Sequence, residues 1–323
     1  MAQYKVVVVS LGYENYDYER EILKPIDAQV IISPIDCTTE EEVIEVAEGA
    51  DAILVRETPV GAKVIASFDR CKIIARYGVG IDNIDLEAAK QKQIYVSNVP
   101  DYGTEDVSDH AVALLLACIR TLLVRDQNLR QGIFETDIKA EIYRTTGRNL
   151  GILGYGKIAR AFHRKWKGFL PNKVLVHDPY VADDVIRENG AEKVDMDTLL
   201  AESDFISIHA PLTSETHHIF DETNLKKMKT SAILVNTARG PIIDENALVK
   251  ALQEGQILSA GLDVFENEPI GKDHPLASMS NVILTSHVAW YSKDSTKDLQ
   301  SGAAREILRV LSGEKPINWV NPW

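Results

Sequence analysis

Apolar, mostly β-branched runs alternate with segments of helical apolar spacing along the first hundred residues. This alternation predicts strands joined by helices, which is typical of a parallel sheet covered on both faces. One helix, expected at residues 39–48, has a capping-box signal because Glu42 follows Thr39 by three positions. The strands of this region are expected at residues 5–10, 29–33, 52–56, 72–76 and 94–97.

A second region begins after residues 99–101 (VPD), which indicate a boundary. We interpret residues 104–130 as one long helix that contains His110 as a packed histidine. This helix has more apolar surface than one buried stripe needs, so we expect part of it to be buried against another domain or subunit.

The alternation of strands and helices resumes at residue 150. The predicted strands lie at residues 150–153, 174–178, 205–209, 232–236, 259–262 and 281–285, and an amphipathic helix follows at 298–311. In a doubly wound sheet, ligands bind beyond the carboxyl ends of the strands. One crevice should therefore be lined by Gly154, Asp178, His209, Arg239, Asp263 and His287.

Residues 151–159 (GILGYGKIA) join a predicted strand to a helix, and the next strand ends at Asp178. Gly154 allows a tight turn, and Gly156 lets the backbone approach a pyrophosphate. The helix N-terminus offers N–H groups and a partial positive charge to phosphates. The Asp178 carboxylate can accept both hydroxyls of an adenosine ribose. The glycines alone also fit an ordinary turn, but the complete order predicts a dinucleotide site.

At 323 residues the chain exceeds one typical domain, and its 45% hydrophobic content suffices for two cores. The expected fold class is α/β with two doubly wound parallel-sheet domains. We expect a Rossmann NAD domain at residues 100–291, inserted in a flavodoxin-like substrate domain made of residues 1–99 plus 292–323. No apolar run reaches a membrane span, and the N-terminus lacks a charged-then-apolar signal, so we expect a cytoplasmic protein.

Net charge and cysteine content limit which binding partners and metal sites we expect. The net charge of −13 argues against nucleic acid and anionic membranes, and it means that local arginines must capture an anionic substrate. Cys37, Cys71 and Cys118 are few and widely spaced, which suits free thiols in a reducing compartment and predicts no metal framework.

Arg239, Glu268 and His287 could form a carbonyl-reduction site. Arg239 can bind the carboxylate of a 2-oxo acid through two parallel hydrogen bonds. His287 can donate the proton that accompanies a hydride from a nicotinamide, and Glu268 can accept the other imidazole N–H. Singly, they also fit a turn arginine, a surface carboxylate and a packed histidine. Their shared placement after strands of one sheet favours the catalytic interpretation.

Residues 76–85 (RYGVGIDNID) end a strand of the first region with two glycines that free the backbone. The amides near Val79 and Gly80 could face a ligand carboxylate, and Arg56 and Arg76 lie at predicted strand ends. A plain turn with solvated arginines fits the same residues equally well.

These segments resemble the D-isomer-specific 2-hydroxyacid dehydrogenases over essentially the full chain. The matching signatures are residues 76–85, 151–159, 234–240 (LVNTARG) and 262–269 (LDVFENEP). Within the family the chain is most similar to the C-terminal-binding-protein branch, through residues 98–100 (NVP), 105–110 (EDVSDH), 177–180 (HDPY) and 289–292 (AWYS). It departs from the family at Ser286, where a proline usually precedes the histidine.

The resemblance implies NAD as the cofactor, Arg239, Glu268 and His287 as the catalytic set, and a homodimer paired through the cofactor domain and its long helix. The expected substrate contacts are Arg76, Val79, Gly80, Arg239 and Trp290, the last as a pocket wall near His287. The expected cofactor contacts are Gly154, Gly156, Lys157, Ile158, Asp178, His209, Pro211, Thr237, Ala238, Arg239, Asp263 and His287.

We therefore expect an NAD-dependent enzyme that interconverts a D-2-hydroxy acid and its 2-oxo acid. One alternative is an NAD(H)-sensing, protein-binding module like the corepressors of the same branch, and another is a phosphoglycerate dehydrogenase-type enzyme. The intact Arg239–Glu268–His287 set favours an enzyme over a sensor. Besides Arg56, the sequence offers no extra cation for a phosphorylated substrate, which favours a small uncharged 2-oxo acid.

Overall fold

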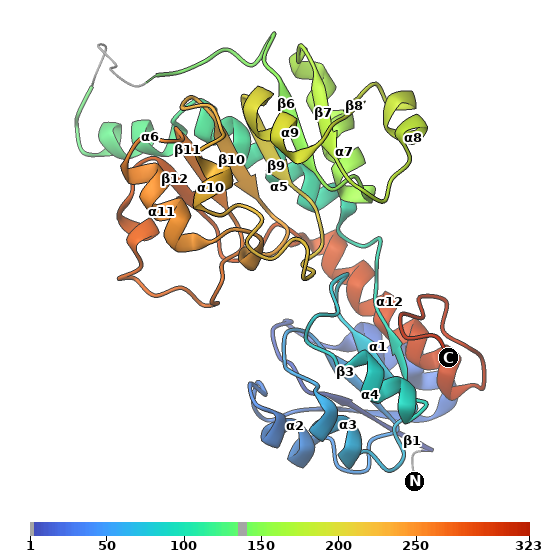
Figure 1. Ribbon diagram of the computed structural model, residues 1–323. Helices are drawn as coiled ribbons and strands as arrows, with labels where there is room; N and C mark the ends of the chain where they lie inside the picture. Colours follow the sequence, from blue (N-terminus) through green and yellow to red (C-terminus); the bar gives the residue numbers. More distant parts are fainter. Residues whose placement is uncertain (1–2, 135–140) are drawn as a thin grey trace. The chain divides into compact units, whose positions relative to one another are not determined.

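The computed structural model describes residues 3–134 and 141–323 (Figure 1). The chain divides into two compact units. The first unit consists of Met1–Gly103 with Ser292–Trp323, and the second unit of Thr104–Tyr291.

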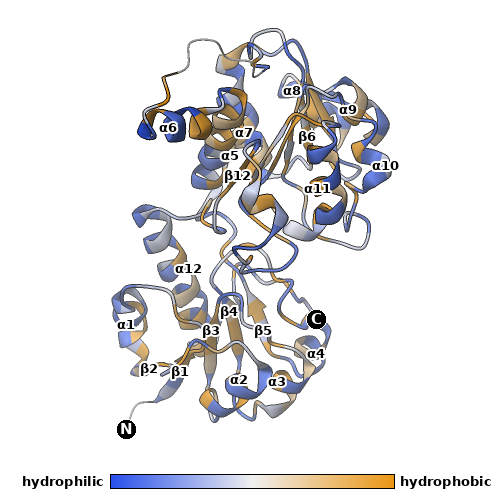
Figure 2. Cartoon of the chain, turned by 90° about the vertical axis from the view of Figure 1, so that its left-hand side faces the viewer, coloured by the Kyte–Doolittle hydropathy of each residue, from blue (hydrophilic) through white to orange (hydrophobic). Residues whose placement is uncertain are grey.

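The first unit contains a five-stranded parallel sheet in the order β2-β1-β3-β4-β5. This is the flavodoxin-like strand order, as the sequence predicts. Every residue of β3 and β4 is buried because helices cover both faces of a parallel sheet, and Figure 2 colours these strands as hydrophobic. The strands are β1 (Tyr4–Val8), β2 (Ala28–Ile32), β3 (Ala52–Val55), β4 (Ile73–Arg76) and β5 (Tyr95–Ser97).

Two helices of the first unit begin at a capping box. The capping box of Thr39 and Glu42 is present at α2, as the sequence predicts. The last helix begins at Lys293 because Ser292 and Ser295 form a second capping box, and the prediction of a start at residue 298 was wrong because the polar first turn hid it. The helices are α1 (Asp17–Leu23), η1 (Lys24–Ile26), α2 (Glu40–Val46), α3 (Ala62–Ser67), α4 (Leu86–Gln91) and α12 (Lys293–Leu311).

The C-terminal tail packs on the edge strand β5. The Asn321 side chain accepts a hydrogen bond from the Val96 amide and donates one to the Ile94 oxygen, and the Trp319 ring meets the edge of Tyr95. The end of the chain therefore covers part of the β5 edge of the five-stranded sheet.

The second unit contains a seven-stranded parallel sheet in the order β12-β11-β10-β9-β6-β7-β8. From β6 the chain runs outward to β8, and then it crosses to β9 and runs to the opposite edge. This reversal makes the β6–β9 boundary the topological switch point of a Rossmann fold. The strands are β6 (Leu150–Leu153), β7 (Val174–His177), β8 (Glu192–Lys193), β9 (Phe205–Ile208), β10 (Ile233–Asn236), β11 (Ser259–Leu262) and β12 (Val282–Leu284).

The stretch 104–130 is not one helix, so that prediction was wrong. It divides into α5 and α6, which are bent by 63° at Thr121, a residue with a left-handed φ of 50°. Neither glycine nor proline marks the break, and the apolar pattern continues through it. The helices of the second unit are α5 (Thr104–Ile119), α6 (Leu122–Arg130), α7 (Lys157–Trp166), η2 (Lys167–Phe169), α8 (Asp183–Glu188), α9 (Met196–Glu202), α10 (Glu222–Leu225), η3 (Gly240–Ile242), α11 (Glu245–Gln253) and η4 (Pro275–Ser278).

Helix length and hydropathy bear on membrane insertion. Among the described residues, no single helix is both long enough and apolar enough to cross a membrane. The bent pair α5 and α6 passes the same test together, by length and composition only.

Candidate active site

The glycine turn after β6 has two glycines in different surroundings. Gly154 is too crowded for a side chain, whereas Gly156 faces open space. Gly154 has φ of 81°, and a Cβ there would lie 2.6 Å from the backbone N and Cα of Ala210. A Cβ on Gly156 would meet nothing within 4 Å. Gly156 caps α7, whose first residues are Lys157 and Ile158. The turn thus presents an open backbone and a helix N-terminus, which are the elements that hold a pyrophosphate.

Asp178 follows β7 directly and holds the glycine turn. Its carboxylate accepts hydrogen bonds from the amides of Tyr155 at 2.7 Å, Tyr180 at 2.8 Å and Val181 at 3.1 Å. A carboxylate has about four lone-pair sites, so three amides do not saturate it. The position at the end of β7, beside the turn, is the one from which an acid can bind a ribose hydroxyl.

The strands beyond the switch point end in further polar groups. His209 follows β9, and its Nε2 lies 2.9 Å from the Ser207 hydroxyl. Burial lowers the pKa of His209 to about 3, so this imidazole is neutral at physiological pH. Thr237 follows β10, and its hydroxyl is buried without a hydrogen-bond partner within the chain. Since buried hydroxyls are normally paired, the orphaned Thr237 Oγ1 fits a site completed by a bound dinucleotide.

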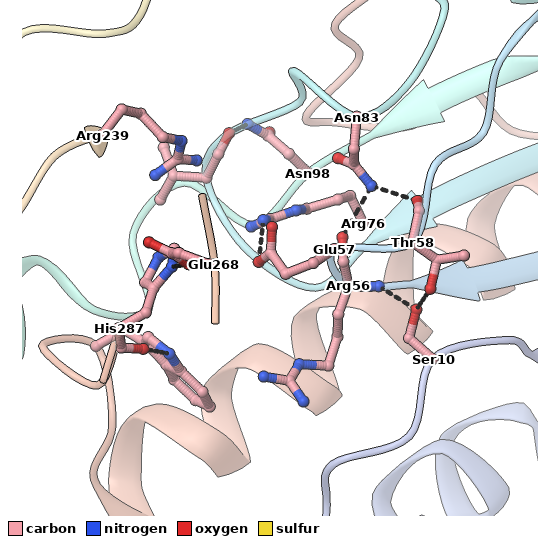
Figure 3. Close-up of polar contacts among 12 residues, drawn as sticks. Ser10, Arg56, Glu57, Thr58, Arg76, Asn83, Asn98, Arg239, Glu268 and His287 are labelled. Carbon is pink, nitrogen blue, oxygen red and sulfur yellow. Dashed lines mark hydrogen bonds and ion pairs between the residues drawn. The ribbon is translucent and has the colours of Figure 1, made fainter. Parts of the chain in front are cut away.

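His287 and Glu268 form a close pair in the second unit (Figure 3). The His287 Nδ1 lies 2.7 Å from Glu268 Oε2, and the Phe265 amide donates to Glu268 Oε1 at 2.9 Å. Burial would raise the pKa of Glu268, but the hydrogen bond and charge of His287, the Phe265 amide and the Arg239 charge together lower it below its usual range. Glu268 is therefore a carboxylate at neutral pH, and it favours a protonated His287.

Arg239 and Trp290 are fixed by their own chain neighbours. Arg239 follows β10 at the start of η3, and its Nη1 donates to the Ala238 oxygen at 2.8 Å. The indole N–H of Trp290 donates to the His287 backbone oxygen at 3.0 Å, which holds the ring beside that histidine.

In the first unit, Arg76 lies at the end of β4 with a side chain only 6% exposed. Its Nη2 donates to Glu57 at 2.6 Å, while its buried Nε has no partner within the chain. Val79 is exposed, and its oxygen accepts a hydrogen bond from Asn98 at 2.7 Å. The Glu57 partner, which sequence reasoning missed, offsets the Arg76 charge. The Val79–Gly80 turn follows Gly78, where an added Cβ would collide with Arg76 Nη1, so the chain passes close to this buried guanidinium.

A glycine turn, an acid after β7 and a histidine–carboxylate pair on one Rossmann sheet define a nicotinamide-dependent oxidoreductase. The sequence model of the D-isomer specific 2-hydroxyacid dehydrogenase family, NAD binding domain, matches residues 112–289. A glyoxylate reductase of Korarchaeum cryptofilum is 41% identical over 287 residues, which cover 88% of this chain and 86% of that protein.

Two further relatives widen the comparison. A D-3-phosphoglycerate dehydrogenase of Methanocaldococcus jannaschii is 40% identical over 289 residues, which cover 88% of this chain and 54% of that protein. The crystal structure of a D-lactate dehydrogenase from Aquifex aeolicus, complexed with NAD and lactic acid, has a TM-score of 0.87 at 29% identity, covering 98% of this chain and 99% of that one.

The chain belongs to the D-isomer specific 2-hydroxyacid dehydrogenase family. It is an NAD-dependent oxidoreductase that interconverts a D-2-hydroxy acid and its 2-oxo acid. The predictions of fold class, cofactor and reaction type are thereby confirmed, whereas the branch within the family and the individual site residues stay predictions.

Proposed function

We propose that this enzyme reduces small, uncharged 2-oxo acids such as glyoxylate, with Arg239, Glu268 and His287 as its catalytic residues. The observation that carries the proposal is the 2.7 Å contact between His287 Nδ1 and a carboxylate that stays ionised at neutral pH. A glyoxylate reductase at 41% identity supports the choice of substrate class.

Each residue has a distinct part in this proposal. Arg239 binds the substrate carboxylate and orients the 2-oxo group. Since Nδ1 of His287 is bonded to Glu268, the proton passes to the substrate oxygen from Nε2. Glu268 stabilises the protonated imidazole before transfer, and the nicotinamide, when bound, supplies the hydride.

NAD would be held by the second unit. Gly154, Gly156 and the first residues of α7 would bind the pyrophosphate, and Asp178 the adenosine ribose. The orphaned Thr237 hydroxyl supports a cofactor contact after β10. The remaining contacts that we propose are Lys157, Ile158, His209, Pro211, Ala238, Arg239, Asp263 and His287.

The first unit would be the substrate-binding domain. We propose that the amides of Val79 and Gly80 and the guanidinium of Arg76 contact the substrate carboxylate. The unpartnered Arg76 Nε supports this assignment, because a buried guanidinium N–H normally has an acceptor.

A phosphorylated 2-oxo acid is the second candidate substrate. Arg56 and Arg76 end neighbouring strands, β3 and β4, and could together meet a phosphate. Two observations favour the uncharged substrate: Arg76 is paired with Glu57, and the Arg56 Nη1 donates to the Leu11 oxygen with its guanidinium over the Tyr13 ring. Two D-3-phosphoglycerate dehydrogenases among the relatives keep this candidate in the test.

A protein-binding NAD sensor of the C-terminal-binding-protein branch is a third candidate function. The pair of His287 and Glu268 favours the enzyme over this sensor.

We also propose a homodimer, supported by the exposed side chains of Leu122, Leu123 and Leu129 on α6. We propose a cytoplasmic location, supported by three buried free cysteines.

One experiment separates these candidates. NADH oxidation is measured with a panel containing glyoxylate, pyruvate, hydroxypyruvate, longer apolar 2-oxo acids and 3-phosphohydroxypyruvate. We expect the highest kcat/KM with a small uncharged acid. A best substrate that carries a phosphate would support the second candidate, and NADH binding without turnover of any acid would support the sensor.

A further inference from the structure

The segment that carries His287 wraps around a buried carboxylate. Asp263, directly after β11, has no exposed surface. Its Oδ1 accepts hydrogen bonds from the Thr285 hydroxyl at 2.5 Å and the Val288 amide at 3.0 Å, and its Oδ2 accepts one from the Ala289 amide at 2.9 Å. The backbone oxygen of Asp263 accepts a hydrogen bond from the His287 amide at 2.7 Å. The position of the histidine therefore depends on how this carboxylate is held.

His110 reaches the same group from α5, which packs beside β11 and β12 (Figure 1). Its Nε2 lies 3.0 Å from Thr285 Oγ1 and 3.6 Å from Asp263 Oδ1. A threonine hydroxyl has only one proton to donate. In Thr285 this proton is donated to Asp263, as the short contact between the two side chains indicates. Oγ1 can then only accept from the imidazole, so His110 is protonated on Nε2. The hydrogen bonds run in one direction, from His110 through Thr285 to Asp263.

We propose that His110 is a positioning residue for His287. Through Thr285 and Asp263 it fixes the backbone of residues 285–289, so that the His287 imidazole stays paired with Glu268. The inference rests on the proposed catalytic role of His287. His110 would then act through hydrogen bonds, whereas its position in an apolar helix had indicated only a packing role.

The backbone of His287 is what makes this support necessary. His287 has a left-handed φ of 54°, which residues other than glycine rarely adopt, so the surrounding hydrogen bonds must hold it there. Reaction rates are sensitive to such placement, since an error of about 1 Å can cost on the order of 10²-fold. Removing the His110 donor leaves the Thr285 oxygen with an unmet lone pair and frees the hydroxyl to rotate away from Asp263.

The test compares pairs of variants that remove or keep each polar group. His110→Leu and Thr285→Val should each lower kcat about tenfold with the fastest 2-oxo acid, because both disturb the same segment. The Kd for NADH, measured by fluorescence titration, should stay within about twofold. His110→Gln and Thr285→Ser, which keep a donor and a hydroxyl, should restore most of kcat. The double variant should lose no more than the worse single variant, because the two groups act in series.

Ser108→Ala is the matched control. Ser108 lies on the same helix, donates to the Thr104 oxygen at 2.8 Å and accepts from Lys165 at 2.7 Å, and these hydrogen bonds do not involve residues 285–289. This variant should keep wild-type kcat. Two results would overturn this inference but not the proposed function. One is a wild-type kcat in His110→Leu. The other is a fall in kcat that goes together with a fall in Tm and that His110→Gln does not restore. A wild-type enzyme inactive on every 2-oxo acid, or full activity of His287→Ala, would overturn the proposed function and this inference with it.

Discussion

At the scale of single residues, the proposed catalytic histidine is held from two sides. Glu268 fixes the His287 ring through Nδ1, and Asp263 fixes its backbone amide. Glu268 is itself fixed by the Phe265 amide. Hydrogen bonds to a catalytic group from residues behind it determine whether that group meets its substrate at a productive distance.

Replacement of the histidine tests its role in proton transfer. In His287→Ala, kcat for 2-oxo acid reduction should fall by about 10²–10⁴-fold, the usual contribution of a general acid. The Kd for NADH should change little, because His287 is one of many proposed cofactor contacts and the glycine turn and Asp178 are untouched. Steady-state kinetics and fluorescence titration measure the two quantities. A variant that keeps most of its kcat would exclude His287 as the proton donor.

Neutralising the carboxylate tests the pair through its pH dependence. The pKa of Glu268 is lowered, so wild-type Glu268 is charged at neutral pH and favours the protonated histidine that the proposed mechanism requires. Glu268→Gln removes that charge, and deprotonation of the histidine then occurs at lower pH. The falling limb of the pH profile of kcat/KM for reduction should move down by about one pH unit. An unchanged profile would remove Glu268 from the mechanism.

At the scale of elements, the strand ends show what the sequence could and could not predict. The glycine turn, α7 and the polar residue after each strand follow from local patterns, and the structure places them at the carboxyl ends of one sheet. The bond between His110 and Thr285 joins residues 175 positions apart, so no local pattern contains it. The bend at Thr121 was equally hidden, because its left-handed residue is neither glycine nor asparagine.

The end of β7 predicts the cofactor preference. Asp178 would repel a 2′-phosphate, and the neighbouring Tyr180 hydroxyl is bonded to a second acid, Glu215. We therefore expect kcat/KM with NADH to exceed that with NADPH by at least about tenfold, since juxtaposed like charges cost more than 1.4 kcal/mol. The ratio is measured on the wild-type enzyme, because substitution of Asp178 would also unpair three backbone amides. Comparable efficiency with both cofactors would refute this reading of the strand end.

At the scale of the whole molecule, we propose α6 (Leu122–Arg130) as the surface for assembly. None of its residues is buried, and Leu122, Leu123 and Leu129 are 52%, 44% and 59% exposed. Several exposed apolar side chains on one helix are typical of a subunit interface. Light scattering should therefore give twice the chain mass of 35.9 kDa.

A matched pair of variants ties the assembly to this helix. Leu129→Asp should shift the mass toward the monomer, because it buries a charge in the interface. Leu170→Asp, at a comparably exposed position outside α5 and α6, should leave the mass unchanged. A wild-type mass of one chain at every concentration would contradict the proposal, as would a Leu129 variant that remains dimeric.

Trp290 is the residue through which the substrate range can be tested on the complete enzyme. Its N–H bond to the His287 oxygen keeps the indole beside the proposed proton donor, where it would meet the side chain of a 2-oxo acid. Each methylene in contact with the ring is worth about 0.8 kcal/mol, or roughly fourfold in binding. Trp290→Ala should therefore raise KM for an apolar 2-oxo acid about fourfold or more, and KM for glyoxylate, which has no side chain, much less. Trp290→Phe keeps a ring and loses the N–H bond, so it separates the wall from the bond. Equal effects of Trp290→Ala on both substrates would show that the indole does not contact the substrate side chain.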